Sequence, residues 1–461
     1  MEILILVSKI TNRLFYIIEL IFKDELGINF KFTTDKEKYL AYEGPKFHYG
    51  QYPLEDDNGL FQQSVNLLFE RDIADQDVKI CKHNDSKAIF PVFNDKSLFP
   101  FDIFAASFYI ISRYEEYLPH VCDKYNRFQP QDSILCKMDL IEKPIINIWA
   151  KELGAYITEK YPDIQLKKKT FKFIPTYDID AAWAYRNKGF FRTVAAFFRD
   201  ALVFNTNEIK RRFEVLTKKR IDPFDTFDYQ IELQKELKLK PLYFILCGDY
   251  NTNDKNISIR NKEFQELIKH LGDYALVGIH PSFSSYLDKK VVKEEIKRLS
   301  EVLNREVTMS RQHFLRLCLP LSYQILNELD ITDDYTMGYA SQAGFRAGYA
   351  DTFAFFDLEN DTKTKLNIHP FALMDGTMRD YLDLDVHESF DKAKKLSANK
   401  FMFSRYEELA NTILQNDGEL KKKRTAFENA KINSQEYFCN TLLELDGLNS
   451  NSRKSIEKLE R

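Results

Sequence analysis

The sequence predicts an α/β fold in two domains, followed by a charged tail. Segments typical of strands alternate with segments typical of helices through the second half of the chain, a pattern that favours parallel strands with helices packed outside them. The 461 residues, 44% of them hydrophobic, are enough for two or three globular domains. The lysine run at 167–169 is the predicted linker. We therefore expect an N-terminal α/β domain of unknown function at 1–165, a second domain at 166–420 and a partly ordered tail at 421–461.

Charge and cysteine content limit the classes of partner and location. The chain has 66 Lys and Arg residues against 70 Asp and Glu residues, a net charge of −4, so these totals indicate neither a nucleic-acid nor an anionic-membrane partner. Small molecules or glycans are the expected partners. The six cysteines lack C-x-x-C spacing, which indicates reduced thiols. The first 22 residues contain several charges and no basic leader, so we expect no membrane span, no signal peptide and a cytoplasmic location.

The N-terminal domain begins with an apolar strand and a helix that runs to about residue 23. Its expected strands lie at 3–7, 27–32 and 87–93. Asp102 is a suitable N-cap for a helix over 103–118, which Pro119 would end. A last helix ends near residue 160.

The second domain repeats the alternation of strand and helix. Its expected strands lie at 170–177, 241–247, 274–279, 308–317, 335–339 and 366–370, and its expected helices at 263–271, 292–303 and 323–329. Ser404 and Glu407 form a capping box for a further helix that Gly418 would end. This order fits either a barrel or an open sheet.

Several polar residues fall at the carboxyl ends of these strands. Asp178 and Asp180 end the first strand, and further candidates are His280, Arg311, His313 and His369. In folds built from βα units, such positions converge on one mouth. Of two carboxylates separated by one residue, one can bind a cation while the other takes a proton from water. An aspartate pair or a single histidine is more often structural, but their joint placement in one series favours a metal-dependent hydrolase.

The order of these motifs resembles a known family. Thr-Tyr-Asp-Ile-Asp at 176–180, Gly-Ile-His-Pro-Ser at 278–282, Arg311 and Leu-Asn-Ile-His at 366–369 are similar to the motifs of the NodB-homology polysaccharide deacetylases, carbohydrate esterase family 4. The likeness covers about 170–418. Residues 1 to about 160 resemble an uncharacterised domain found ahead of such modules in bacterial surface-glycan proteins. The resemblance implies a distorted (β/α) barrel, a divalent metal, usually Zn²⁺, and hydrolysis of an N-acetyl group on a sugar.

The resemblance also implies a role for each motif residue. Asp178 matches the catalytic base and Asp180 the metal-binding aspartate of the family. His280 matches its first metal histidine. Arg311 resembles the arginine that orients the base, and His369 the histidine that protonates the leaving amine.

Two positions depart from the family pattern. Ser284 stands where the family has its second metal histidine, and Pro281 replaces the usual Ser or Thr. Either the third ligand comes from elsewhere, with His313 as the candidate, or the site has lost tight metal binding. Asp375 is a candidate partner for the His369 imidazole, although a surface role is the simpler interpretation. A catalytically degenerate protein that binds glycans or acts as a scaffold is therefore the alternative function, and amide hydrolysis on a non-sugar substrate is a third.

Two further segments have possible binding roles. The loop Gly-Phe-Arg-Ala-Gly at 344–348 could bring Arg346 to a substrate, and Tyr177 is a second candidate for substrate binding. The basic segment 210–220 could contact anionic lipid or a lipid-linked glycan, although a solvated helix face is the simpler interpretation. Peripheral membrane contact is thus a possible partner interaction.

Overall fold

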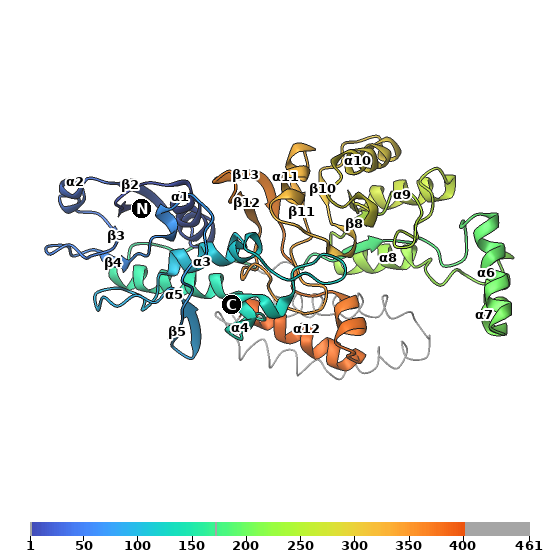
Figure 1. Cartoon of the computed structure of the whole chain (residues 1–461), viewed down its shortest axis with the longest axis horizontal. Coiled ribbons are helices and arrows are strands. Elements are labelled where there is room, and N and C mark those ends of the chain that lie inside the picture. The colour runs from blue at the N-terminus through green and yellow to red at the C-terminus, as the bar shows by residue number, and fades with distance from the viewer. Residues whose placement is uncertain (1, 171–172, 402–461) are drawn as a thin grey trace, which may run out of the picture. The chain divides into compact units, whose positions relative to one another are not determined.

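A computed structural model describes residues 2–170 and 173–401. The chain divides into two compact units, Met1–Phe171 with Leu317–Thr377 and Lys172–Arg316 with Met378–Arg461. Each unit contains parallel strands and helices, so the α/β class is confirmed (Figure 1). The helix predicted after Ser404 and the predicted tail at 421–461 lie outside the described residues.

A four-stranded parallel sheet forms the start of the first unit. Its strands, in the order β2-β1-β3-β4, are β1 (Glu2–Leu6), β2 (Asn29–Thr33), β3 (Lys46–Gly50) and β4 (Leu60–Gln63). Helix α1 (Asn12–Ile18), which Thr11 caps, continues as a π-helix over Glu19–Glu25 and connects β1 to β2. The predicted strands at 3–7 and 27–32 are confirmed, and β3 and β4 are additional.

Helices and a hairpin complete the N-terminal part of this unit. They are α2 (Lys36–Leu40), α3 (Ile103–Ile111), α4 (Ile134–Lys137), α5 (Ile145–Lys160) and the antiparallel pair β5 (Ile80–His83) and β6 (Ser86–Ile89). Asp102 caps α3 by accepting bonds from the backbone of Phe104 and Ala105. The predicted extension of α3 to residue 118 is wrong, because Arg113 adopts a left-handed conformation with φ of 55°.

The core of this part is rich in aromatic side chains. Phe22 after α1, Phe47 on β3 and Phe104 on α3 pack together with ring centroids 5.8–6.1 Å apart. All three side chains are fully buried. These contacts join the helices to the sheet, so these three aromatic side chains serve packing.

Residues 317–377 also belong to the first unit. They form α11 (Leu321–Glu328), β11 (Asp333–Asp334), β12 (Phe353–Asp357) and β13 (Thr362–Ile368). Strand β13 pairs in parallel with β11 and antiparallel with β12, which departs from the all-parallel expectation. The predicted strand at 335–339 is wrong. The Asp334 carboxylate accepts bonds from the backbone and hydroxyl of Thr336, and this turn ends the strand at Asp334.

Buried charges hold this segment to the N-terminal part. The Glu116 carboxylate pairs with Arg113 at 2.8 Å and with Arg346 at 2.6 Å, and all three side chains are buried. The Ile146 amide donates to the Gly348 carbonyl. The sequence analysis had placed this segment in the second domain. In the structure it belongs to the same compact unit as the N-terminal residues, because these contacts join residues up to 230 positions apart.

The second unit contains four parallel strands in the order β10-β9-β8-β7. They are β7 (Thr176–Ile179), β8 (Leu242–Ile245), β9 (Leu276–Ile279) and β10 (Met309–Ser310), and the helices between them are α6 (Phe190–Leu202), α7 (Thr206–Leu216), α8 (Phe227–Leu237), α9 (Lys262–Tyr274) and α10 (Lys289–Leu303). Helix α12 (Val386–Phe401) follows later in the chain. Strand β10 is much shorter than predicted. No barrel is shown by the strands of the described residues.

The cysteines and the apolar helices bear on two expectations from the sequence, and both are assessed within the described residues. The five cysteines of this part of the chain form no disulfide. No helix within 2–170 and 173–401 has the length and apolar character needed to cross a membrane.

Candidate metal centre

The strands of the second unit deliver their polar residues to one edge. Because β7, β8, β9 and β10 are parallel, the residues that follow them lie at the same edge of the sheet. Asp180 follows β7 directly, His280 follows β9, and His313 lies three residues after β10. The residues are far apart in sequence, and the sheet brings them together.

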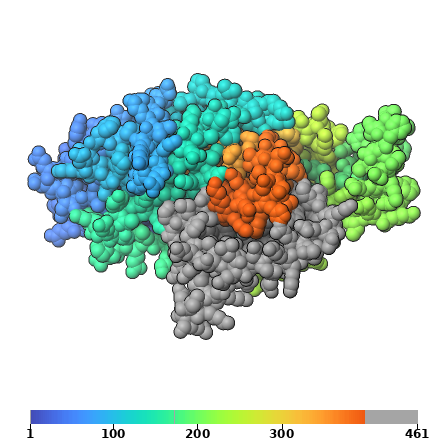
Figure 2. All heavy atoms as spheres, turned by 90° about the horizontal axis from the view of Figure 1, so that it is seen from below, coloured from blue at the N-terminus to red at the C-terminus, as the bar shows by residue number. Residues whose placement is uncertain are grey.

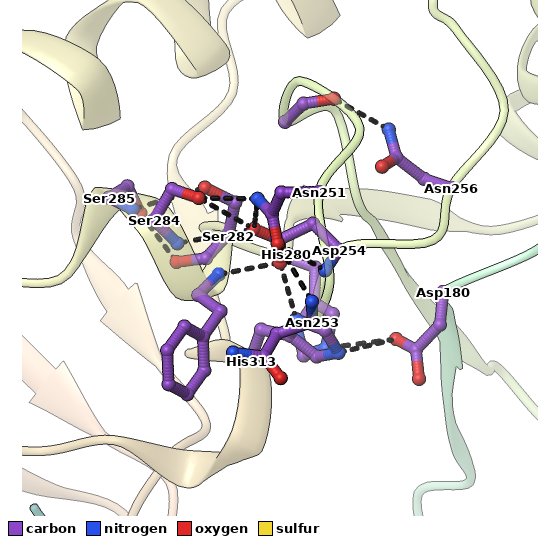
Figure 3. A network of polar contacts seen from close by, with 12 residues as sticks. Asp180, Asn251, Asn253, Asp254, Asn256, His280, Ser282, Ser284, Ser285 and His313 are labelled. Carbon is purple, nitrogen blue, oxygen red and sulfur yellow. Dashed lines mark hydrogen bonds and ion pairs between the residues drawn. The ribbon is translucent and has the colours of Figure 1, made fainter. Parts of the chain in front are cut away.

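Asp180, His280 and His313 form a cluster that could hold a metal ion. One ligand atom from each lies within 4.8 Å of the others. Asp180 Oδ1 is 3.3 Å from His280 Nε2 and 3.7 Å from His313 Nε2. Figure 3 shows the Asp180 carboxylate facing the two imidazole rings across the edge of the sheet. The sequence had named all three residues as metal ligands.

The backbone fixes the orientation of His280. Its Nδ1 lies 2.5 Å from the carbonyl oxygen of Arg311, which can only accept a hydrogen bond. Nδ1 therefore carries a proton, and Nε2 is the ring nitrogen that faces Asp180. A carbonyl partner on the far ring nitrogen is typical of metal-binding histidines.

A buried carboxylate orients His313 in the same way. His313 Nδ1 lies 2.9 Å from Asp254 Oδ1, which leaves Nε2 facing Asp180. The turn that carries His313 is unusual, because Phe314 and Leu315 both have positive φ angles, 60° and 53°. Such angles are unfavourable for residues with a β-carbon and persist where surrounding contacts enforce them. One such contact is the bond from the His313 amide to the Pro281 carbonyl.

Asp254 is a functional candidate that the sequence analysis missed. Its carboxylate also accepts bonds from the Phe283 backbone amide at 2.7 Å, the Ser284 hydroxyl at 2.9 Å and the Asn251 side-chain Nδ2 at 2.6 Å (Figure 3). It lies in the loop after β8, at the same sheet edge as the other candidates, so the strand-end pattern itself was the available signal. Ser284 thus contacts the cluster indirectly, through Asp254.

The electrostatics of the cluster follow from these contacts. Desolvation would raise the pKa of Asp180, but hydrogen bonds from His280 and His313 outweigh it and hold this pKa well below its usual range. Burial would likewise raise the pKa of Asp254, but its hydrogen bonds outweigh this effect and hold the pKa well below its usual range. The bond from His313 contributes most to this lowering. Burial would lower the pKa of His313, yet the carboxylates of Asp180 and Asp254 raise it to about 9.

The donor set fits a divalent cation. Two imidazoles, each neutral once it has bound a metal, and one carboxylate suit zinc and similar transition metals. Both histidine side chains are almost fully buried, whereas the Asp180 side chain is 55% exposed, so the cluster is open to solvent on the carboxylate side. A site of three protein ligands with one open side is typical of catalytic rather than structural metals. The identity of the metal is not shown.

Asp178 and Arg311 form an ion pair beside the cluster. Arg311 Nη1 donates to Asp178 Oδ1 at 3.1 Å and to the Thr176 hydroxyl at 2.7 Å. The guanidinium lies over the Phe244 ring of β8, the strand that pairs with the strand of Asp178. Arg311 therefore contacts His280 through its carbonyl and Asp178 through its side chain.

His369 lies in the first unit. Its Nε2 is 2.7 Å from Asp333 Oδ1, its Nδ1 is 2.9 Å from the Thr352 hydroxyl, and the Tyr335 ring stacks on it at 4.3 Å. The hydrogen bond from His369 lowers the pKa of Asp333. The carboxylate at this imidazole is thus Asp333, a residue that the sequence analysis did not single out.

The two predicted substrate-binding residues are both engaged in packing. Arg346 is buried, with its guanidinium bonded to both carboxylate oxygens of Glu116 and to the Gly338 carbonyl. This geometry accounts for Arg346 as part of the fold of the first unit, so we do not propose it as a substrate ligand. Tyr177 is also buried and stacks on Tyr243 of β8 with ring centroids 5.0 Å apart.

Parts of the chain are similar to known proteins. Residues 3–162 match a family of unknown function (DUF7033). No curated protein matches the chain in sequence. Among solved structures, the chain is similar to a candidate polysaccharide deacetylase from Mycobacterium smegmatis at 12% identity and a TM-score of 0.31, over 50% of this chain and 72% of that one. At that level of likeness neither fold nor function follows from it.

Proposed function

We propose that this chain is a metal-dependent hydrolase that removes an N-acetyl group from a sugar in bacterial surface-polysaccharide metabolism. The observation that carries the proposal is the convergence of Asp180, His280 and His313, with both Nε2 atoms turned toward the carboxylate. The distorted barrel, the sugar substrate and a cytoplasmic location remain predictions from the sequence.

The three clustered side chains would hold the cation, with Zn²⁺ as the expected metal. A bound divalent ion lowers the pKa of water and polarises a carbonyl oxygen, which is the activation that hydrolysis of an amide requires. The orientation of His280 by the Arg311 carbonyl and of His313 by Asp254 directs Nε2 of both rings toward the position that the cation would occupy.

Asp178 is the proposed general base. It is separated by one residue from Asp180, so both side chains leave the extended chain on the same side. The ion pair with Arg311 fixes the position of the Asp178 carboxylate, and a carboxylate can accept a proton from water. Arg311 is thus a positioning residue.

The family resemblance assigns to His369 the protonation of the leaving nitrogen, and this role remains a prediction from the sequence. An amide anion is too poor a leaving group near neutral pH, so the nitrogen must gain a proton as the bond breaks. The contacts with Asp333 and Thr352 fix the orientation of the His369 ring within the first unit.

Metal analysis and turnover of purified variants test the proposal. We expect about one transition-metal ion per chain in chelator-free protein, and release of acetate from a member of a panel of N-acetylated sugars and nucleotide sugars. His280→Ala should lose the metal, whereas Asp178→Asn should keep the metal and lose about 10²–10⁴ in turnover. Asp249→Asn is the matched control, because this carboxylate is also in the loop after β8 but is 91% exposed.

Two results would contradict the proposal. If Asp178→Asn released acetate as fast as the wild type, Asp178 would not be the general base. A wild-type chain that binds glycans but holds no metal and releases no acetate would support the alternative, a degenerate deacetylase-like protein with a binding or scaffolding role.

A further inference from the structure

A helical hairpin between β7 and β8 exposes a large apolar surface. Helices α6 and α7 lie side by side beyond α8 and α9 of the same unit (Figure 1), and their atoms are drawn in green in Figure 2. Phe191, Phe198, Leu202 and Phe204 are 68–88% exposed. The first three follow the i, i+7, i+11 spacing of one helix face, and Phe204 lies at the corner between the helices. Exposed apolar surface of this extent is typical of an interaction site.

The hairpin is held together on a different side. Asp200 of α6 and Arg212 of α7 form a buried ion pair at 2.6 Å. The Arg212 guanidinium lies over the ring of Tyr185, and the Tyr185 hydroxyl bonds to Glu208. These contacts join α6, α7 and the preceding loop without the exposed phenylalanines, so the apolar face is not the core of the hairpin.

The same segment carries a concentrated positive charge. Residues 188–221 contain nine Lys and Arg residues and three Asp and Glu residues, although the whole chain has a net charge of −4. The three acidic side chains all pair inside the hairpin or with its basic residues. The lysines at 218 and 219 and Arg220 are exposed and follow α7 directly. The outer surface of the hairpin is therefore apolar and cationic together.

We propose that the α6–α7 hairpin docks on the surface of an anionic lipid bilayer. Phenylalanine and leucine side chains on one helix face would enter the interfacial region, and the adjacent basic side chains would lie at the anionic head groups. A second copy of the chain is a poorer occupant, because it would bring two basic clusters together. This docking is peripheral and is independent of the hydrolase proposed above.

Co-sedimentation of the full chain with vesicles tests the proposal. We compare vesicles of phosphatidylcholine alone with vesicles that also contain phosphatidylglycerol. The wild type should bind the anionic vesicles and be released by high salt. Replacing Phe191, Phe198 and Phe204 together by Ser should lower the partition coefficient at least about tenfold. Replacing Lys218, Lys219 and Arg220 together by Ala should lower it on the order of a hundredfold.

The matched control is Phe93→Ser, which changes an 87% exposed phenylalanine of the first unit and should leave vesicle binding unchanged. Circular dichroism and metal content of each variant establish that the fold is kept. Failure of the wild type to bind anionic vesicles would overturn the proposal, as would equal binding by the triple phenylalanine variant. A concentration-dependent dimer that this variant abolishes, without vesicle binding, would assign the surface to self-association instead.

Discussion

The chain surrounds a carboxylate with basic side chains in two regions, and the two clusters differ in the kind of base. In the first unit, buried Glu116 pairs with two arginines, which hold its pKa at about 2 although burial alone would raise it. In the second unit, solvent-open Asp180 faces two histidines. An arginine keeps its proton in proteins, whereas an imidazole can release one and present a lone pair. The first cluster is therefore closed and structural, and only the second can exchange protons for a metal ion.

The largest expected effect concerns the closed cluster. Glu116→Gln leaves two buried guanidinium groups without their carboxylate and should reduce the free energy of unfolding by about 3–5 kcal/mol. Urea denaturation measures this change. Glu159→Gln, at an exposed position of α5, is the control and should change stability by no more than about 0.5 kcal/mol. Equal denaturation midpoints for the two variants would refute the structural role of Glu116.

The next effect concerns the partner of His313. Asp254→Asn removes the charge that holds the imidazole and should weaken metal affinity about 10–100-fold. Competition with a chromogenic chelator measures the affinity, and Asp249→Asn is again the control. Unchanged affinity in Asp254→Asn would mean that the cluster does not depend on this contact.

The pH dependence of metal affinity distinguishes an imidazole cluster from a guanidinium cluster. The pKa of His313 is raised to about 9 in the metal-free protein, so its proton must leave when a metal binds. Zinc affinity should therefore rise about tenfold per pH unit between about pH 7 and 9 and level off above. The same titration of His313→Gln should lose this slope, and a slope that persists would assign the released proton to another group.

The smallest effect concerns Ser284. Its hydroxyl donates a hydrogen bond to Asp254, which in turn orients His313, so Ser284→Ala should weaken metal affinity by about 1 kcal/mol, roughly fivefold. Isothermal titration with zinc resolves a change of this size. A loss as large as that of His280→Ala would show that Ser284 is itself a ligand.

The strand-end pattern was the most informative feature of the sequence. It identified Asp180, His280 and His313 because parallel strands must present their carboxyl ends at one edge. The same reasoning applied to β8 would have drawn attention to Asp254. This residue is harder to find because it lies farther along the chain from the end of β8 than Asp180, His280 and His313 lie from the ends of their strands. Helices α6 and α7 were not predicted, although the basic segment that contains most of α7 was noted.

The sequence by itself determined the alternation of strands and helices and the residue types at the strand ends, because both depend on local spacing. Only the tertiary structure decided which side chains meet. The attachment of 317–377 to the first unit, the Asp254 contact of His313 and the exposure of the α6–α7 face all depend on contacts between residues distant in sequence. Local patterns cannot encode such contacts, since burial and charge pairing arise when separate segments pack together.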